Sequence, residues 1–294
     1  MSPLNYDQPL FRPPSEGDNL IIQATLGCSF NQCSFCSMYK QKSYRARPLS
    51  DICRDIQTAA RDWPQAQRVF LADGDALALP TDQLIAILDE LNRALPQLTR
   101  VSCYATPSNI LHKSAAELQR LKDHKLRLLY LGIESGADMI LKKVTKGATQ
   151  RSIAEAMLKA DASGMKVSGT VILGLGGQAY WQQHIEGTIE LLNQAPITYL
   201  STLQLFLHES AQAEFYERFS EPFQAQDDTA ILREQQRLIQ GLEPPQRLIF
   251  RSNHASNALA LAGNLPTDKQ RLLSQIEQAL NGQLTLRPDY LRSL

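Results

Sequence analysis

Three cysteines, Cys28, Cys33 and Cys36, lie within nine residues, directly after an apolar segment at 19–25. That segment is typical of a buried strand, and Gly27 opens the loop that carries the thiols. Strand and helix patterns then alternate along the chain. A strand that ends in a loop of thiols, followed by such an alternation, indicates a metal site at the mouth of an α/β barrel.

The alternation of strands and helices is regular up to residue 207. Consecutive β–α units favour parallel strands joined by right-handed crossovers. Six strands are fewer than the eight of a complete barrel, so we expect an α/β fold, a partial (β/α)6 TIM-like barrel. The expected strands are 19–26, 68–72, 101–104, 126–133, 167–173 and 197–207, and the expected helices are 51–63, 81–95, 114–124, 137–144, 150–162 and 180–194.

The two ends of the chain lie outside this repeat. Residues 1–18 are rich in proline and are expected to form an extended N-terminal arm before the core barrel of 19–207. Residues 208–294 are expected to form a mainly helical C-terminal extension, with helical patterns at 226–241 and 267–281. The basic stretch 40–47 is expected to be a solvated loop.

The composition limits the partners and the compartment. Lys+Arg and Asp+Glu number 30 each, so the formal net charge is zero and nucleic acid is not indicated as a partner. The N-terminal sequence lacks the pattern of a signal peptide, and no apolar run approaches the roughly 20 residues that span a bilayer. We therefore expect no membrane association and a cytoplasmic protein, in which clustered cysteines bind metal more often than they form disulfides.

The spacing of the cysteines is compatible with three kinds of site. A zinc site needs four ligands, and the fourth would be Cys53, Cys103 or a distant histidine. A plant-type [2Fe–2S] centre uses the same C-x4-C-x2-C spacing with a distant fourth cysteine. A [4Fe–4S] cluster held by three thiolates leaves one iron open to an outside ligand. Cys53 and Cys103 fall in an expected helix and strand, where a cysteine usually acts as a small buried apolar residue.

The thiol loop, its place after the first strand and Phe35 directly before the third cysteine resemble the radical SAM superfamily. The usual motif of that superfamily is CxxxCxxC, whereas here four residues separate the first two cysteines. The resemblance covers roughly 19–207. The segment from Leu131 to Gly136, with Lys146 to Thr149 downstream, is similar to the ESG…KGxT signature of the methylthiotransferase, elongator-type and coproporphyrinogen-oxidase-like branch.

The resemblance implies a set of cofactor-binding residues at the ends of the strands. The three cysteines would bind a [4Fe–4S] cluster. Asp73, Gly74 and Asp75 take the place of the GGE segment that binds the methionine amino group of S-adenosylmethionine, although D-G-D is also a common turn. The remaining residues implied are Tyr104 and Ser108 at the pocket lip, Glu134 and Ser135 at the ribose or methionine, and Gly169, Gly174 and Leu205 beside adenine.

The resemblance also implies a reaction. A reduced flavodoxin- or ferredoxin-type donor would supply one electron, and cleavage of S-adenosylmethionine would give a 5′-deoxyadenosyl radical that abstracts hydrogen from an unknown substrate. The alternative is a non-catalytic iron–sulfur carrier or sensor with Cys53 or Cys103 as fourth ligand. Arg251 and His254 are candidate catalytic residues, although the polar stretch 250–257 that holds them is also typical of a hydrogen-bonded turn. His184 is expected to be a structural helix residue.

Overall fold

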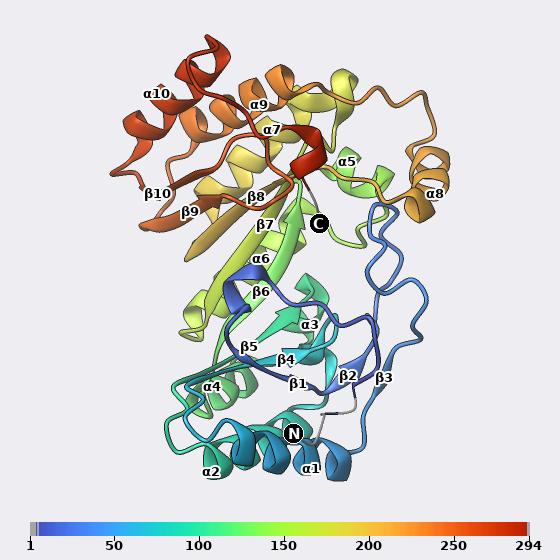
Figure 1. The fold of residues 1–294 in the computed structure, drawn as a ribbon, viewed down its shortest axis with the longest axis vertical. Helices are drawn as coiled ribbons and strands as arrows, with labels where there is room; N and C mark the ends of the chain where they lie inside the picture. Colours follow the sequence, from blue (N-terminus) through green and yellow to red (C-terminus); the bar gives the residue numbers. More distant parts are fainter. Residues whose placement is uncertain (1–3, 5, 293–294) are drawn as a thin grey trace. The chain divides into compact units, whose positions relative to one another are not determined.

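The computed structural model describes Leu4 and residues 6–292. The chain has an α/β fold built on an open, mostly parallel eight-stranded sheet, which confirms the predicted fold class (Figure 1). It forms two compact units. The first comprises the chain up to Asn31, Cys36–Leu131 and Lys159–Val167, and the second comprises Gln32–Phe35, Gly132–Leu158 and the chain from Ser168.

The first unit contains the parallel strands β1, β4 and β5 and the part of β6 up to Leu131, in the order β1-β4-β5-β6. Apolar side chains fill both faces of the inner strands, as expected of a parallel sheet, and Val69, Phe70 and Leu71 are fully buried. The strands are β1 (Leu20–Gln23), β4 (Arg68–Ala72), β5 (Arg100–Ala105) and β6 (Leu126–Glu134), and the short pair β2 (Thr25–Leu26) and β3 (Arg45–Ala46) is antiparallel. The helices are α1 (Leu49–Asp62), α2 (Thr81–Ala94), α3 (Pro107–His112) and α4 (Ala115–Asp123).

The second unit contains β7, β8 and β9 in parallel and β10 antiparallel to β9. The C-terminal extension is mainly helical, as predicted, and also adds two strands, because alternate residues of β9 and β10 are buried. The strands are β7 (Lys166–Leu173), β8 (Tyr199–Gln204), β9 (Leu248–Ser252) and β10 (Leu261–Leu265). The helices are α5 (Asp138–Lys143), α6 (Gln150–Ala162), α7 (Gly177–Gln194), α8 (Glu209–Phe219), α9 (Asp228–Gly241) and α10 (Lys269–Leu280).

The N-terminal arm and the basic stretch are both packed onto the first unit. The Tyr6 hydroxyl donates to Ile21 O at 2.9 Å, and the fully buried Glu16 carboxylate accepts from Arg100 at 2.8 Å. Arg45 is exposed, as predicted for a solvated loop, but the prediction was wrong for Lys42 and Arg47, whose side chains are only 7% and 15% exposed. Each has a carboxylate partner, and sequence pattern alone does not show such a partner.

Within Leu4 and residues 6–292, no helix combines the length and the apolar character that crossing a bilayer requires.

Candidate active site

The cysteine loop begins against the D-G-D segment that follows β4. The Gly74 amide donates to Gly27 O at 3.0 Å, and the Gly27 amide donates to Asp73 Oδ2 at 3.0 Å. The Ser29 amide donates to Asp75 Oδ1, also at 3.0 Å. The structure therefore brings the loop around Cys28 and the D-G-D segment together through three backbone donors.

Gly74 is required by the close approach of this loop. An added Cβ at Gly74 would lie 2.8 Å from Cys28 Cβ, closer than real contacts allow, and a tight 3.0 Å from Gly27 O. The glycine thus sets the distance between the end of β4 and the first thiol.

Both carboxylates of the segment are fully buried and hold the loop through hydrogen bonds. Burial raises the pKa of Asp75 to about 6, against the opposing effect of the Ser29 hydroxyl and amide, which both donate to this carboxyl group. Burial also raises the pKa of Asp73, and donors from Gln23, Gly27 and Lys42 oppose that rise. Each carboxylate already has several donors from its own chain, so its first role in this geometry is to position the loop.

The three loop thiols are partly exposed. Burial is the main cause that raises the pKa of Cys28, and the negative charge of Asp75 adds to it. Cys33 lies in the segment Gln32–Phe35, where Phe35 packs on an apolar cluster of the second unit that includes Phe215. A thiol with a raised pKa becomes a ligand only when a bound metal favours the thiolate.

Two features of the described residues bear on metal binding at the loop. Among Leu4 and residues 6–292, no three His, Cys, Asp or Glu side chains gather closely enough to hold one metal ion. A zinc site needs four ligands on one ion, whereas three thiolates on a [4Fe–4S] cluster bind three different irons and leave the fourth open. Cys103 is fully buried in β5, and burial raises its pKa to about 12, so it is a poor candidate for a further ligand.

The two predicted pocket-lip residues differ in their surroundings. Tyr104, one residue before the end of β5, makes edge contacts with Phe70 and Tyr130, at ring-centroid distances of 5.1 and 6.1 Å. Burial raises the pKa of Tyr104, as do Tyr130 and the nearby Cys36 thiol. Ser108 lies in α3, where its hydroxyl bonds His112 Nδ1 at 3.0 Å on an exposed surface. Of these two residues, Tyr104 is therefore the one that lies near a thiol of the cysteine loop.

Glu134 ends β6 in the second unit in a left-handed backbone conformation, with φ of 63°. Its carboxylate is 7% exposed and accepts from Lys146 Nζ at 2.8 Å. The two charged residues of the ESG…KGxT segment are therefore an ion pair, and Lys146 fixes the direction of the carboxylate.

Ser135, the next residue, forms a hydrogen bond with a fully buried histidine on α7. His184 Nε2 donates to Ile172 O at 3.0 Å, so Nδ1 accepts from the Ser135 hydroxyl at 2.8 Å. Burial lowers the pKa of His184 to about 4, against the smaller effect of its bond to Ile172. The histidine is neutral near pH 7 and orients Ser135, which agrees with the expected structural role.

Gly174, at the end of β7, is held by a carboxyl group that the sequence motifs did not indicate. Its amide donates to Glu234 Oε2 at 2.5 Å, and its φ of 81° requires a glycine. Burial raises the pKa of Glu234 to about 8, so this side chain on α9 is protonated near neutral pH. In the part of the chain that the structure describes, Glu234 Oε1 has no hydrogen-bond partner.

Gly169 and Leu205, the other predicted adenine neighbours, have close contacts within the second unit. An added Cβ at Gly169 would lie 2.4 Å from Ile197 Cδ1 and 2.5 Å from Ile133 Cδ1. The Leu205 amide donates to Leu173 O at 2.9 Å, which continues the β7–β8 pairing by one residue. A side chain at position 169 would therefore require both isoleucine side chains to shift.

The polar stretch 250–257 comprises the last residues of β9 and a turn that hydrogen-bonds to the end of β8. The Asn257 amide group donates to Thr202 O at 2.8 Å and accepts from the Gln204 amide at 2.7 Å. Arg251 is exposed on β9, and His254 Nδ1 accepts from the Ser256 amide at 3.1 Å. Burial and the charge of Arg287 lower the pKa of His254. These contacts are those of a hydrogen-bonded turn, the alternative to a catalytic role for this stretch.

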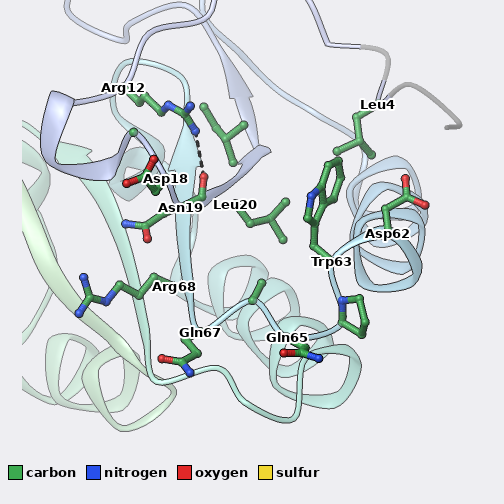
Figure 2. Close-up of a pocket in the computed structure, with 14 residues that line it drawn as sticks. Leu4, Arg12, Asp18, Asn19, Leu20, Asp62, Trp63, Gln65, Gln67 and Arg68 are labelled. Atoms are coloured by element: carbon green, nitrogen blue, oxygen red, sulfur yellow. Dashed lines mark hydrogen bonds between the residues drawn. The ribbon is translucent and has the colours of Figure 1, made fainter.

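A cavity of about 860 Å³ opens in the first unit, where β1 and β4 begin (Figure 2). Leu20 and Arg68 line it together with Trp63, which is 49% exposed, and Arg12 donates to Asn19 O at 2.9 Å beside it. The D-G-D segment follows the other end of β4. The cavity therefore lies at the opposite ends of these strands from the cysteine loop.

The chain is similar in sequence and fold to several known proteins. The family model described as "Radical SAM superfamily" matches residues 22–192, more than half of the chain. The heme chaperone of Bacillus subtilis is 24% identical over 164 residues, which cover 53% of this chain and 42% of that protein. The tRNA-2-methylthio-N(6)-dimethylallyladenosine synthase of Alkalilimnicola ehrlichii is 24% identical over 193 residues, 61% of this chain and 41% of that one.

The matched part of the chain thus spans about two-fifths of the length of these relatives. Among solved structures, methylornithine synthase aligns with 94% of this chain and 76% of its own, with a TM-score of 0.56 and 13% identity. At that identity the likeness concerns the fold.

Proposed function

Because the chain belongs to the radical SAM superfamily of enzymes, we propose that Cys28, Cys33 and Cys36 hold a [4Fe–4S] cluster at which S-adenosylmethionine binds. The cluster and S-adenosylmethionine are the cofactors of that superfamily. When bound, the cluster supplies the electron that cleaves S-adenosylmethionine to a 5′-deoxyadenosyl radical, which abstracts hydrogen from a substrate. The curated relatives support the methylthiotransferase and coproporphyrinogen-oxidase-like branch.

The observation that carries this proposal is the attachment of the thiol loop to the end of β4. Three backbone N–H groups of Gly27, Ser29 and Gly74 take part in it, and Gly74 leaves no room for a side chain beside Cys28. A loop held in this way keeps its first thiol in place before any metal arrives.

The other predicted residues have separate proposed roles. The 73–75 backbone contacts the methionine amino group, with Tyr104 and Ser108 at the pocket lip. In the second unit, Glu134 and Ser135 contact the ribose or methionine, and Gly169, Gly174 and Leu205 lie beside adenine. Three of these residues are held in place by a hydrogen bond, which supports their proposed roles. Preorganised groups bind a ligand with less loss of conformational freedom. The pairs are Lys146 with Glu134, His184 with Ser135, and Glu234 with Gly174.

Substrate and electron donor are proposed only by class. A reduced flavodoxin- or ferredoxin-type protein supplies the electron, and the hydrogen donor is a substrate still to be identified. Arg251 is an exposed cation that suits a carboxylate or phosphate on that substrate, and His254 lies three residues along the same turn.

Anaerobic reconstitution tests the proposal. We expect about four iron atoms per chain and, after reduction, release of 5′-deoxyadenosine from S-adenosylmethionine. Cys28→Ala, Cys33→Ala and Cys36→Ala should each lose the cluster, while Cys53→Ala and Cys103→Ala should keep it. Full iron loading without 5′-deoxyadenosine would contradict the enzymatic function. Loss of the cluster in Cys53→Ala or Cys103→Ala would instead support the carrier or sensor.

A further inference from the structure

Lys42 is a buried lysine whose ammonium group is surrounded by oxygen atoms. Its side chain is 7% exposed. The ammonium donates to Asp7 O at 2.8 Å, to Pro9 O at 2.7 Å and to Asp73 Oδ2 at 3.2 Å. The Asp7 carboxylate lies 2.9 Å away as well. Burying an ammonium is costly unless its hydrogens are all used, and here they join the N-terminal arm to the D-G-D segment.

Gln23 makes a second connection between the same two parts. Its side-chain amide donates to Asp7 O and to Asp73 Oδ1, each at 3.0 Å, and its oxygen accepts from the Asp7 amide at 2.9 Å. Both connections meet at Asp73, which accepts from the Gly27 amide directly before Cys28. The arm is thus linked to the thiol loop through one buried carboxylate.

The backbone of residue 42 also supports the longer spacer between Cys28 and Cys33. An added Cβ at Gly27 would lie 3.0 Å from Lys42 O, so the two backbones are in contact. Asn31 has a left-handed backbone, with φ of 41°, and its amide donates to Tyr39 O at 2.8 Å and to Lys42 O at 3.4 Å. The four-residue spacer therefore turns at Asn31 and rests on the 39–42 segment.

We propose that Lys42 is a positioning residue for the cluster. With Gln23, it makes the N-terminal arm a strap that fixes Asp73 and, through Asp73, the backbone of Gly27 and Cys28. The strap slows the loss of the cluster, because Cys28 leaves its position only when buried contacts of the arm also break. This inference rests on the proposed function, since it assigns a role toward the cluster that the loop is proposed to hold.

The test uses the full reconstituted chain and measures how fast an iron chelator removes the cluster anaerobically. We expect Lys42→Met to lose iron at least tenfold faster than wild type, and Lys42→Arg, which keeps a cation, to recover part of the difference. Lys166→Met is the matched control on an exposed lysine. The free energy of unfolding of each apo chain is measured alongside, so that loss through global unfolding can be subtracted.

If Lys42→Met does not fold, Asp7→Asn is the variant that tests the strap. Asp7 has an exposed side chain, and its substitution changes only the arm side of the strap. We expect it to accelerate iron loss about threefold. Wild-type rates in both Lys42→Met and Asp7→Asn would overturn the strap while leaving the proposed function intact. Failure of the wild-type chain to bind any cluster would instead overturn the proposed function and, with it, this inference.

Discussion

The two compact units each contain a buried carboxyl group that holds a loop or turn. Near pH 7 one of these groups is ionised and the other is neutral. In the first unit, burial raises the pKa of Asp75 only to about 6, since the Ser29 amide and hydroxyl both donate to it. In the second, burial raises the pKa of Glu234 to about 8, since Gly174 supplies a single donor. Asp75 is therefore ionised and Glu234 protonated.

In both groups burial is the larger cause and raises the pKa, and the hydrogen-bond donors oppose it, with two donor groups at Asp75 and one at Glu234. The first group lies in a network of neighbouring loops that meet at Cys28. The second lies on a helix of the C-terminal extension and holds the turn after β7. We therefore expect changes in the first network to affect the cluster, and changes in the second to affect mainly the stability of the fold.

The largest expected effect is that of Gly136→Ala in the second unit. An added Cβ would lie 2.6 Å from Thr188 Cα, on a backbone that has no flexible side chain to move aside. We expect the free energy of unfolding, measured by urea titration, to fall by about 3 kcal/mol or more. Gly282→Ala is the control, because it meets nothing within 4 Å and should cost about 1 kcal/mol for its left-handed backbone alone. Equal losses in the two variants would contradict the packing argument.

Gly74→Ala is the corresponding change in the first unit. The new methyl group displaces Cys28, so we expect the iron content after reconstitution to fall by more than half, with a loss of stability of about 2 kcal/mol. Iron analysis and urea unfolding of the same samples check this. A Gly74→Ala chain with full iron would remove the distinction between the two networks.

The charge state of Glu234 can be tested by comparing the pH dependence of stability in wild type and Glu234→Gln. The folded pKa of Glu234 is about 8 against an ordinary value of 4.5, so its contribution to stability is present below pH 4.5 and is lost as pH rises through 8. His184 acts in the opposite direction, because its folded pKa of about 4 lies below 6.5 and its contribution is lost as pH falls from 6.5 toward 4.

Between pH 6.5 and 8, the contribution of Glu234 to stability therefore changes while that of His184 does not. Across it, we expect the wild-type free energy of unfolding to fall by about 2 kcal/mol more than that of Glu234→Gln, which does not ionise. Glu209→Gln, at an exposed position on α8, is the control and should follow wild type. Parallel curves for wild type and Glu234→Gln would show that the buried carboxyl group is already ionised.

The smallest expected effect is that of Ser29→Ala. It removes the hydroxyl that donates to Asp75 Oδ2 and leaves the amide bond to Oδ1 intact. We expect a loss of about 1 kcal/mol in the free energy of unfolding and an unchanged iron content. Ser108→Ala, whose hydroxyl bonds only a histidine of its own helix, should change neither quantity. Cluster loss in Ser29→Ala as large as in Gly74→Ala would place the hydroxyl among the essential contacts of the loop.

Strand positions were well predicted where apolar runs are short and bounded. The prediction of 68–72 coincides with β4, whereas β10 was missed because Leu261–Leu265 contains glycine and asparagine, which have low strand propensity. The sixth strand was predicted too long, at 197–207, since β8 extends only over Tyr199–Gln204.

In the site, spacing indicated the thiols, but their supports come from distant parts of the chain. Asp73 and Gly27 are 46 residues apart, and no local pattern predicts that they bond. The partners of Lys42, Asp7 and Asp73, are also distant in sequence, so the basic run that contains Lys42 was predicted to be solvated. Glu234 did leave a signal, because it falls three residues after Ile231 and four before Leu238, on the buried face of α9.

The division into two units has a consequence for how unfolding can be observed. The chain has two tryptophans, and Trp63 belongs to the first unit while Trp181, on α7, belongs to the second. Intrinsic fluorescence of a Trp181→Phe chain therefore reports on the first unit, and that of a Trp63→Phe chain on the second. Coincident denaturant midpoints for the two single-tryptophan chains would mean that both halves melt in one all-or-none transition, and separate midpoints would resolve a half-folded species.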